Sequence, residues 1–458
     1  MIKNVISVID GAAGSCGKAK VIGEIATDKS INLGAAVTNC MPNAGHSFVD
    51  ERGTKTVFRN IPVSSINSNT DLFIGPGSAI DMKVFADEYK RVKPYLNGRK
   101  IYVHCRVPLI EERHKQWERE HIKTGSTHEG CGAVLRDKVV RDPDCKFFEG
   151  YEDAVVCSDI EWKDRLYPHL DNSNEYVLLE GSQGCDLDLD SDNYPYVTSR
   201  PISTSQLLSY SKISPKRLLQ TIMVIRPFPI RISNIAKSGE IFYSGGYGTG
   251  EELTWTQVNL ASMYGRYPYR GDIQEQYDYI LSKRLIRKGL KYCPEHYKKQ
   301  IFGKDYENIK PEDVSILQAL EMERLYHKSK GEDCYESRYL RNMPLFDQDL
   351  SNRTIIDQSE LTTVTKKERR IFDLDIERLK DNCRVNDPDY LYLNFFQHLD
   401  YDYRGLKGNY DNILLDTHLE QYIAWLEDST NVEVAALGTG ARNGQRILKK
   451  QLVKSIEK

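Results

Sequence analysis

The sequence predicts an α/β fold, a mostly parallel central sheet flanked by helices, with a helical insertion. Short apolar runs alternate with helical patterns from residue 1 to about residue 255. Most of these runs end in glycine, proline or polar residues, and the same alternation returns after residue 357. Such alternation is typical of a parallel sheet covered by helices. Ligands of such sheets bind at the loops that follow the strands.

Seven apolar runs are the predicted strands. Glycine-rich or charged loops begin where three strands end, at VIDGAAG (8–14), LIEERH (109–114) and LLEGSQG (178–184). The segment LEQYIAWLED (419–428) has helical spacing and restores the alternation near the C-terminus. The runs are NVISVI (4–9), DLFIGPG (71–77), KIYVHC (100–105), YVLLEG (176–181), QTIMVIRPF (220–228), DYLYLNFF (389–396) and VEVAALGTG (432–440).

Residues 257–357 differ in composition and are predicted to be a helical insertion. They are rich in tyrosine, lysine, arginine and glutamate. YDYILSKRLIRKGLKY (277–292) and PEDVSILQALEMERLYHK (311–328) have helical spacing, and Pro311 predicts the start of the second helix. The insertion separates residues 1–256 from residues 358–458. Its tyrosines and cations could bind a nucleic-acid strand, but packing of amphipathic helices explains the tyrosines more simply.

Charge and composition exclude several classes of protein. The chain has 458 residues and a formal net charge of −3, so electrostatics give no reason to expect nucleic-acid binding. We find no leader peptide and no apolar run long enough to cross a bilayer, so a soluble cytoplasmic protein without a membrane partner is expected. Ten cysteines occur singly, a pattern that indicates reduced thiols.

Residues 8–25 resemble a phosphate-binding loop without completing its usual pattern. Three glycines and a Gly-Lys step lie between an apolar strand and a helix that begins near Lys18, and backbone N–H groups in such a loop can bind phosphate. The P-loop pattern requires glycine where Ala12 stands and serine or threonine where Ala19 stands. The hydroxyl that usually binds Mg²⁺ is therefore missing, and Ser15 occupies the middle of the loop.

The segment MPNAGHSFV (41–49) places Asn43, Gly45 and His46 on a tight turn before a strand. A lone histidine is more often structural than functional. Here the small neighbours leave the imidazole and a backbone carbonyl exposed to a ligand.

Residues 178–200 contain four aspartates at alternate positions, from residue 186 to residue 192. A calcium loop would need glycine at Ser191 and glutamate at Val197, so an acidic loop is the better interpretation. Gln183 and Thr198 are stronger candidates, since amide and hydroxyl groups can bind a base or a sugar.

Two further loops combine hydroxyls with cations. In SELTTVTKKERRIFDLD (359–375), threonines precede Lys367 and Arg369, and guanidinium groups suit a carboxylate ligand. In GSTHEGCGAVLRDKVVRD (125–142), a Gly/Ser/Thr loop leads to basic residues that include Arg141. Together, the loops predict a site for several anionic groups.

The order of these motifs resembles the adenylosuccinate synthetase family. The motifs are the glycine loop with its GK step, NAGH, GST with KVVRD, EGSQG with YPYVTS, and TVT followed by RR. The resemblance covers about residues 1–256 and 359–445. It implies a P-loop-related fold and a ligase that joins L-aspartate to C6 of a purine nucleotide. A nucleoside triphosphate first phosphorylates the 6-oxo group, and the amine of aspartate then displaces phosphate.

The resemblance also implies site residues, Mg²⁺ as cofactor and a homodimer. Arg141 matches the arginine that reaches into the neighbouring subunit's site. The implied roles are catalysis for Ser15, Lys18 and His46; purine monophosphate binding for Asn43, Ser126, Thr127, Arg141, Gln183 and Thr198; triphosphate binding for Gly14, Cys16, Gly17, Lys18, Ala19, Gly438 and Gly440; aspartate binding for Thr363, Val364, Thr365, Lys367 and Arg369; and metal binding for Ser15 and Gly45.

Three departures from the family pattern favour a particular substrate. Ser15 stands where the family has an aspartate that takes the N1 proton from IMP, and serine cannot be a comparable base. The Thr-Lys-x-Asp motif that recognises GTP is absent from YLNFFQHLD (392–400), which favours ATP or dATP. Lys367 replaces an arginine. Ser15, the missing guanine motif, EELTWTQ (251–257) and ELTTVTKKERRIF (360–372) together resemble a bacteriophage subgroup that converts dGMP to 2-amino-6-succinyl deoxyadenylate. This resemblance implies dGMP or GMP as substrate.

Two alternatives remain open. An ordinary synthetase that uses IMP and GTP would share most of the motifs, although it would need the missing aspartate. A non-catalytic nucleotide-binding scaffold would account for the loss of that aspartate, but Lys18, His46 and Arg369 are all retained. Assays with dGMP and IMP distinguish these possibilities.

Overall fold

The computed structural model describes residues 1–237, 240–264, 290, 293–310, 313–332, 334–336, 354–362 and 367–456. The chain forms two compact units. Unit 1 comprises Met1–Glu251, Leu361–Phe396 and Gly405–Lys458, and unit 2 comprises Glu252–Glu360 and Gln397–Arg404.

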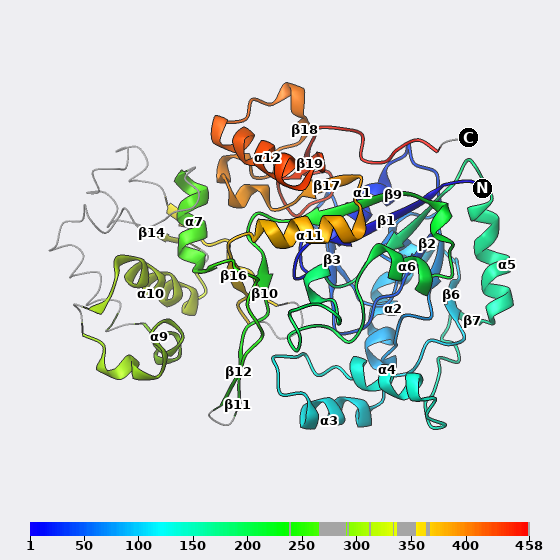
Figure 1. Cartoon of the computed structure of the whole chain (residues 1–458), viewed down its shortest axis with the longest axis horizontal. Coiled ribbons are helices and arrows are strands. Elements are labelled where there is room, and N and C mark those ends of the chain that lie inside the picture. The colour runs from blue at the N-terminus through cyan, green and yellow to red at the C-terminus, as the bar shows by residue number, and fades with distance from the viewer. Residues whose placement is uncertain are drawn as a thin grey trace. The chain divides into compact units, whose positions relative to one another are not determined.

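Unit 1 is built on an eleven-stranded sheet in the order β18-β20-β19-β17-β9-β1-β8-β2-β5-β6-β7 (Figure 1). All neighbouring strands are parallel except β19 and β20, which confirms the predicted fold class. The strands are β1 (Val5–Asp10), β2 (Leu33–Thr38), β5 (Asp71–Ile74), β6 (Ile101–His104), β7 (Ala154–Cys157), β8 (Tyr176–Glu180), β9 (Leu218–Ile225), β17 (Tyr390–Leu393), β18 (Gly408–Asn409), β19 (Val434–Gly438) and β20 (Arg446–Leu448).

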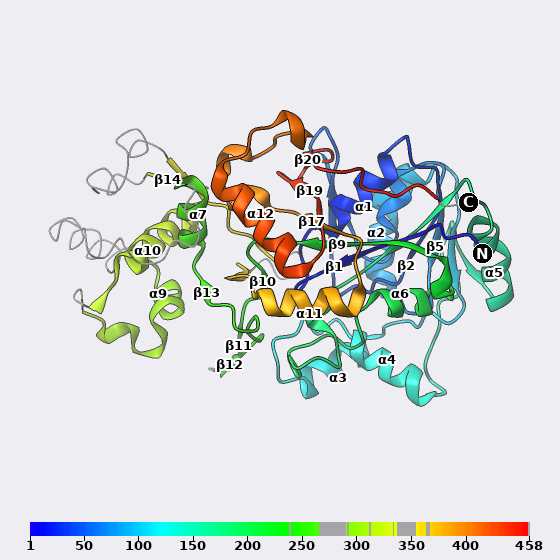
Figure 2. The same ribbon diagram turned by 45° about the horizontal axis from the view of Figure 1, so that its top comes forward.

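Helices cover both faces of this sheet. Figure 2 shows α1 and α11 on opposite sides of β1. Shorter strands complete unit 1: β3 (His46–Val49) pairs with β4 (Lys55–Phe58), β10 (Ile230–Arg231) with β16 (Arg370–Phe372), and β11 (Ile235–Lys237) with β12 (Glu240–Phe242). The helices are α1 (Lys18–Thr27), α2 (Met82–Leu96), α3 (Glu112–His121), α4 (Cys131–Val140), α5 (Asp159–Leu170), α6 (Thr204–Tyr210), α11 (Ile376–Asn386) and α12 (Thr417–Thr430).

The central strands are buried on both faces, which explains why they read as continuous apolar runs. All six residues of β1 are buried, and Ile6 and Val8 pack in one cluster with Val21 and Ile22 of α1. This packing fixes the first turn of α1 directly after the loop that follows β1. The seven predicted strands correspond to β1, β5, β6, β8, β9, β17 and β19.

The described part of unit 2 combines three helices with short strands. They are α7 (Trp255–Tyr264), α9 (Glu295–Phe302), α10 (Ile316–Ser329), β13 (Glu252–Leu253), β14 (Cys334–Glu336) and β15 (Thr354–Ile356). The predicted helix start at Pro311 is wrong. The helix begins at Ile316, because Ser315 caps it through the Gln318 N–H in a capping box. Apart from residue 290, the helix predicted over residues 277–292 lies outside the described residues.

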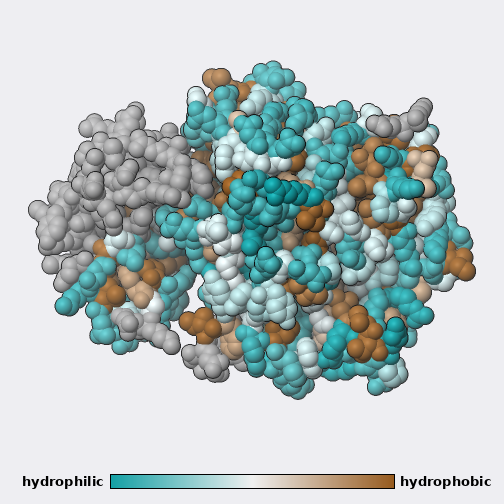
Figure 3. All heavy atoms as spheres, in the orientation of Figure 1, coloured by the Kyte–Doolittle hydropathy of each residue, from teal (hydrophilic) through white to brown (hydrophobic). Residues whose placement is uncertain are grey.

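On the face in Figure 3, hydrophilic residues predominate and hydrophobic residues form scattered groups. No helix in the described ranges is long and apolar enough to cross a membrane. The cysteines whose side chains are described carry free thiols.

Candidate active site

The loop after β1 folds around a buried carboxylate that belongs to β1 itself. Asp10 accepts hydrogen bonds from the N–H groups of Ala12 (3.1 Å), Gly14 (3.2 Å) and Cys16 (2.9 Å). Its Oδ2 lies 3.1 Å from the Lys18 ammonium, and both side chains are buried. The amides of the predicted phosphate loop thus bind an internal anion in this structure.

The loop after β1 has a left-handed backbone at Gly14, Ser15 and Gly17, and it exposes the Ser15 side chain. Gly14 and Gly17 adopt φ angles of 88° and 89°, which glycine tolerates far better than other residues. Ser15 adopts φ 59° and is exposed, whereas Cys16 and Ala19 are buried. Burial and the Asp10 charge raise the pKa of the Cys16 thiol. The neutral Ser15 hydroxyl is therefore accessible to solvent or a ligand, while Cys16 is buried in the hydrophobic core.

The loop after β8 packs directly against the loop after β1. The Lys18 ammonium donates to the Gln183 carbonyl at 2.6 Å, and the Gln183 side-chain amide donates to Asn43 Oδ1 at 3.2 Å. Gln183 has φ 63°. Lys18, Gln183 and Asn43, predicted from three separate motifs, therefore lie together in the structure.

Gly184 allows this close approach, and its substitution gives a testable result. A Cβ at Gly184 would lie 2.0 Å from the Ala12 carbonyl oxygen and 2.2 Å from the Gly14 nitrogen, both backbone atoms. We expect Gly184→Ala to lower the free energy of unfolding by about 1–3 kcal/mol and to weaken triphosphate binding, as measured by urea unfolding and nucleotide titration. Gly246→Ala is the control, because its Cβ would have only an ordinary contact at 3.6 Å. Unaltered nucleotide binding in the Gly184 variant would contradict this account.

His46 is the first residue of β3, directly after the predicted turn. Its Nε2 lies 3.5 Å from the Cys40 thiol. Desolvation and the nearby Lys18 charge lower the pKa of His46 to about 3, and burial raises the pKa of Cys40 to about 11. Near neutral pH the pair consists of a neutral imidazole and a neutral thiol. The imidazole can donate one N–H to an anion without carrying charge itself.

The remaining purine-site candidates lie near the start of α4. The Asn43 backbone hydrogen-bonds to the thiol of Cys131, the first residue of α4. A Cβ at Gly132 would lie 2.6 Å from the hydroxyl of Ser199, the neighbour of Thr198. Ser126 and Thr127 are half-buried in the loop that leads into α4. These contacts place the segments that contain Asn43, Ser126, Thr127 and Thr198 close to the start of α4.

Arg141 lies at the opposite end of α4 from this cluster. It follows the last helical residue, adopts φ 58° and is exposed. A ten-residue α-helix spans about 15 Å, so Arg141 is not brought together with Ser126 and Thr127 within one chain.

Asn394 joins the loop after β1 to the ends of β17 and β19. Its Nδ2 donates to the Cys16 carbonyl at 3.0 Å, and its N–H donates to the Ile225 carbonyl at 2.9 Å. A Cβ at either Gly17 or Gly438 would lie 2.1 Å from the Asn394 side chain. The predicted triphosphate residues Gly17 and Gly438 therefore both adjoin Asn394. Gly440 follows two residues later and is half-buried.

Arg226, like Asn394, contacts the loop after β1 and was not predicted from the sequence. It is fully buried at the end of β9, its Nη1 donates to the Ser15 carbonyl at 3.1 Å, and its guanidinium lies 4.0 Å from the centre of the Phe395 ring. The only sequence signal for Arg226 and Asn394 is a polar residue near the end of a predicted apolar run.

The predicted aspartate loop is described in part. Thr363, Val364 and Thr365 lie outside the described residues. Thr362 and Lys367 exchange hydrogen bonds, from the Thr362 N–H to the Lys367 carbonyl (2.7 Å) and from the Lys367 N–H to the Thr362 hydroxyl (3.0 Å). Lys367 is exposed and Arg369 half-buried. Lys367 therefore belongs to an antiparallel stem, in which Leu361 also pairs with Glu368, and Arg369 directly follows that stem.

The acidic loop after β8 is a structural element. Asp188 accepts from the Asp190 N–H at 2.8 Å and from the Ile202 N–H. Asp186 is buried, and its burial raises the pKa to about 6. Within the described residues, no group of three or more His, Cys, Asp or Glu side chains could hold a metal ion.

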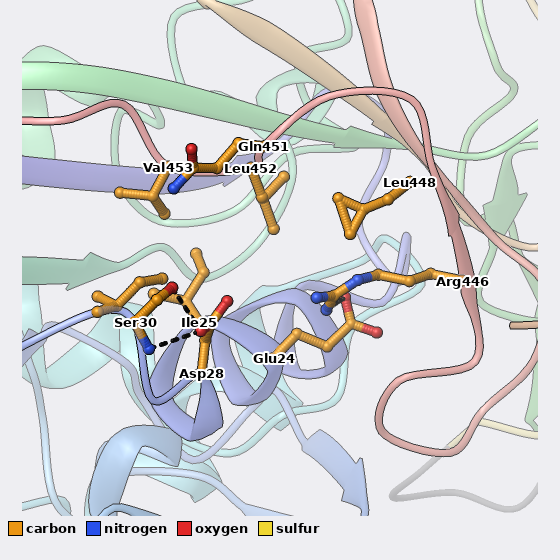
Figure 4. A pocket seen from close by; sticks show the side chains of 10 residues that line it. Glu24, Ile25, Asp28, Ser30, Arg446, Leu448, Gln451, Leu452 and Val453 are labelled. Carbon is orange, nitrogen blue, oxygen red and sulfur yellow. Dashed lines mark hydrogen bonds and ion pairs between the residues drawn. The ribbon is translucent and has the colours of Figure 1, made fainter. Parts of the chain in front are cut away.

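A hollow of about 240 Å³ lies at the C-terminal end of α1 and in the following turn (Figure 4). Glu24 and Arg446 form an ion pair of 2.8 Å on its wall. Glu24 lies six residues beyond Lys18 along α1, about 9 Å at the helical rise. The hollow is therefore separate from the loop that carries Ser15. Its lining residues are Glu24, Ile25, Asp28, Ser30, Ile31, Arg446, Leu448, Gln451, Leu452 and Val453.

Comparison with known proteins finds relatives by sequence. A sequence model of the adenylosuccinate synthetase family matches residues 8–158 and 160–266. The N6-succino-2-amino-2'-deoxyadenylate synthase of Vibrio phage phiVC8 is 31% identical over 270 residues, 56% of this chain and 74% of that protein. The adenylosuccinate synthetase of Pyrococcus horikoshii is 32% identical over 235 residues, 50% of this chain and 66% of that protein.

Solved structures share the fold over nearly the whole chain. Cyanophage S-2L succinoaminodeoxyadenylate synthetase, bound to dGMP and to dATP as an energy donor, aligns with a TM-score of 0.65 at 20% identity, covering 98% of this chain and 96% of that chain. Fully ligated adenylosuccinate synthetase from Plasmodium falciparum aligns with a TM-score of 0.60 at 15% identity, covering 98% and 100%. With the family match across more than half of its residues, this chain belongs to the adenylosuccinate synthetase family.

Proposed function

We propose that this chain is a ligase that joins L-aspartate to C6 of dGMP or GMP, with ATP or dATP as phosphate donor. The product is 2-amino-N6-succinyl-(deoxy)adenylate, a precursor of 2-aminoadenine nucleotides. The observation that carries the substrate assignment is Ser15, an exposed neutral side chain in the middle of the phosphate loop. The phage relatives, which are named for the deoxyadenylate product, support it.

In this proposal the first step makes a phosphate ester at C6. The 6-oxygen attacks the γ-phosphorus of the donor, the bond to the β-phosphate oxygen breaks, and the N1 proton passes to solvent water. The Lys18 ammonium would leave its contact with Asp10 for the phosphates, and the neutral His46 imidazole would donate to the transferring group. Gly14, Cys16, Gly17 and Ala19 would complete the triphosphate loop.

In the second step the aspartate amine attacks C6 and inorganic phosphate leaves. Asn43 and Gln183 already share a hydrogen bond of 3.2 Å, and we assign them with Ser126, Thr127 and Thr198 to the purine monophosphate. Lys367 lies in the antiparallel stem and Arg369 directly follows it, and both are assigned to the aspartate carboxylates, which guanidinium and ammonium groups suit. Arg141, exposed and remote from these residues, would act in the site of the other subunit of a homodimer.

The described residues fit a Mg²⁺ ion only if the phosphates of a bound nucleotide supply most of its ligands. The Ser15 hydroxyl and the Gly45 carbonyl are neutral oxygens, and the Asp10 carboxylate already accepts hydrogen bonds from three loop amides. Mg²⁺ usually binds through one or two carboxylates together with substrate phosphates. When bound, it would neutralise charge on the phosphates. Ser15 and Gly45 would add weak contacts to it.

Phosphate release by the purified protein tests the function directly. With ATP, Mg²⁺ and aspartate, we expect turnover with dGMP or GMP and a succinylated product by mass spectrometry. Turnover with IMP alone would instead assign ordinary adenylosuccinate synthesis. Binding of nucleotides without any turnover would indicate a non-catalytic role and would refute the proposal.

Substitution of Ser15 tests why the serine is there. We expect Ser15→Asp to shift the ratio of kcat/KM for dGMP to that for IMP at least about tenfold toward IMP. The carboxylate would supply a base for N1 and would occupy space beside the 2-amino group. Aspartate tolerates the left-handed backbone at this position. Ser15→Asn, equal in size but uncharged, is the matched control, and a similar shift in both variants would attribute the effect to size alone.

A further inference from the structure

Arg200 is a buried cation in unit 1, and its guanidinium bonds to the loops that follow three neighbouring strands. Its Nη1 donates to the Asn39 carbonyl at 2.8 Å and to the Gly77 carbonyl at 2.7 Å, and its Nη2 donates to the Ser182 hydroxyl. Asn39 directly follows β2, Gly77 lies three residues after β5, and Ser182 lies two residues after β8. These strands are parallel neighbours in the order β8-β2-β5. One side chain therefore joins three adjacent loops at the edge of the sheet where ligands of such folds bind.

The same loops carry residues that are proposed to bind the purine monophosphate. Asn43 belongs to the loop after β2, and Gln183 belongs to the loop after β8. Thr198 lies two residues before Arg200, and its N–H donates to the Leu187 carbonyl at 2.8 Å. Arg200 is therefore a common partner of the segments that contain these three residues, although no sequence motif singled it out.

The guanidinium of Arg200 makes these bonds without an acidic partner. Arg200 is only 3% exposed, and no carboxylate in the described ranges forms an ion pair with it. Burial lowers the pKa of Arg200, and the groups that oppose this shift are the thiols of Cys40 and Cys131 and the phenol of Tyr210. A buried cation without an opposite charge reduces stability, which indicates a role for Arg200 beyond stability.

The bond to Ser182 is the part of this arrangement that reaches the loop after β8. The loops after β2 and β5 are also joined by Asn39, whose Oδ1 accepts from the Gly77 N–H at 3.1 Å. Asn39 Nδ2 donates to the Ser211 hydroxyl at 3.1 Å as well. Loss of the Ser182 hydroxyl would therefore release the loop that carries Gln183 and leave the other two loops joined.

We infer that Arg200 is a positioning residue for the purine monophosphate, because it fixes the spacing of the loops that carry Asn43, Gln183 and Thr198. This inference rests on the proposed function, which assigns those three residues to that ligand. Arg200 does not have to touch the substrate. The loss of Arg200 should weaken binding of the monophosphate more than binding of the triphosphate, because Asp10 holds the loop proposed for the triphosphate separately.

Equilibrium titration of two variants with dGMP and with ATP tests the inference. Ser182→Ala removes one acceptor and should raise Kd for dGMP about three- to tenfold. Arg200→Met removes all three hydrogen bonds and should raise Kd for dGMP about 30- to 100-fold, because small displacements of positioning groups have large effects. Kd for ATP should change less than about threefold in both variants. If Arg200→Met does not fold, Ser182→Ala still tests the inference.

Arg99→Met is the matched control, because Arg99 makes the same kind of bonds at the opposite end of the sheet. Its guanidinium donates to the carbonyls of Leu96 (3.0 Å), Ser65 (2.8 Å) and Thr70, and Thr70 directly precedes β5. Both arginine substitutions leave buried carbonyls without a donor, so both should lower the midpoint of urea unfolding. Only Arg200→Met should weaken dGMP binding.

The outcomes separate the inference from the proposed function. Unaltered dGMP affinity in Ser182→Ala and Arg200→Met would overturn the inference and leave the proposed function intact. Equal weakening of dGMP and ATP, or equal weakening of dGMP by Arg99→Met, would reduce Arg200 to a structural residue and would also overturn it. A wild-type protein that binds none of dGMP, GMP and IMP would refute the proposed function and, with it, the inference.

Discussion

Replacing Lys18 with methionine is expected to reduce phosphate release by about 10³-fold or more. The ammonium lies between Asp10 Oδ2 (3.1 Å) and the Gln183 carbonyl (2.6 Å), where the loops after β1 and β8 meet. Phosphoryl transfer depends on positive charge at the phosphates, which Lys18 would supply once its ammonium leaves Asp10. The same substitution leaves the Asp10 carboxylate buried without its cation, so it should also lower the free energy of unfolding by about 3–5 kcal/mol.

A double variant separates these two effects. Lys18→Met with Asp10→Asn removes both charges, so most of the lost stability should return while turnover stays low. Lys93→Met is the stability control, because its ion pair with Glu152 is exposed and should contribute little to stability. Urea unfolding and initial rates of phosphate release are the measurements. Recovery of turnover in the double variant would show that Lys18 acts only by neutralising Asp10.

Sequence reasoning was most successful where one local pattern determines one structural feature. The apolar runs became strands of the parallel sheet, since their burial on both faces requires continuous apolar residues. The glycines and the GK step gave a loop between β1 and α1. Asn43 and Gln183 were predicted as ligand contacts, and the structure places them 3.2 Å apart. Their ligand-binding role remains a prediction.

The contacts that organise the site depend on the tertiary fold and could not be predicted in this way. Asp10 reads as the last residue of a strand, and nothing nearby shows that its carboxylate takes the loop amides. Asn394 lies more than 370 residues from Cys16, its hydrogen-bond partner. Arg226 likewise reaches Ser15 only because β9 pairs with β1. Parallel pairing of distant strands creates these contacts, so composition and spacing do not reveal them.

Replacing His46 with asparagine is expected to lower kcat by about 10²–10⁴-fold with a smaller change in KM for the nucleotides. Desolvation, together with the charge of Lys18, lowers the pKa of His46 to about 3. The pH dependence of kcat/KM, which reports ionisations of the free enzyme, should therefore show no ionisation of His46 between pH 6 and 9. An unfolded histidine takes up a proton below its ordinary pKa of 6.5, so His46 contributes stability above that pH that is lost as the pH falls toward 3.

The pH dependence of stability distinguishes this account from a purely structural one. Wild-type protein should lose stability between about pH 6.5 and pH 3 more steeply than His46→Asn, because asparagine takes up no proton. Cys40→Ala removes the 3.5 Å thiol contact and should change kcat less than about tenfold, since a neutral thiol adds little charge stabilisation. If the wild-type rate instead depends on an ionisation near pH 6.5 that is absent from His46→Asn, the imidazole titrates in the free enzyme. Desolvation and the Lys18 charge would then not keep it neutral.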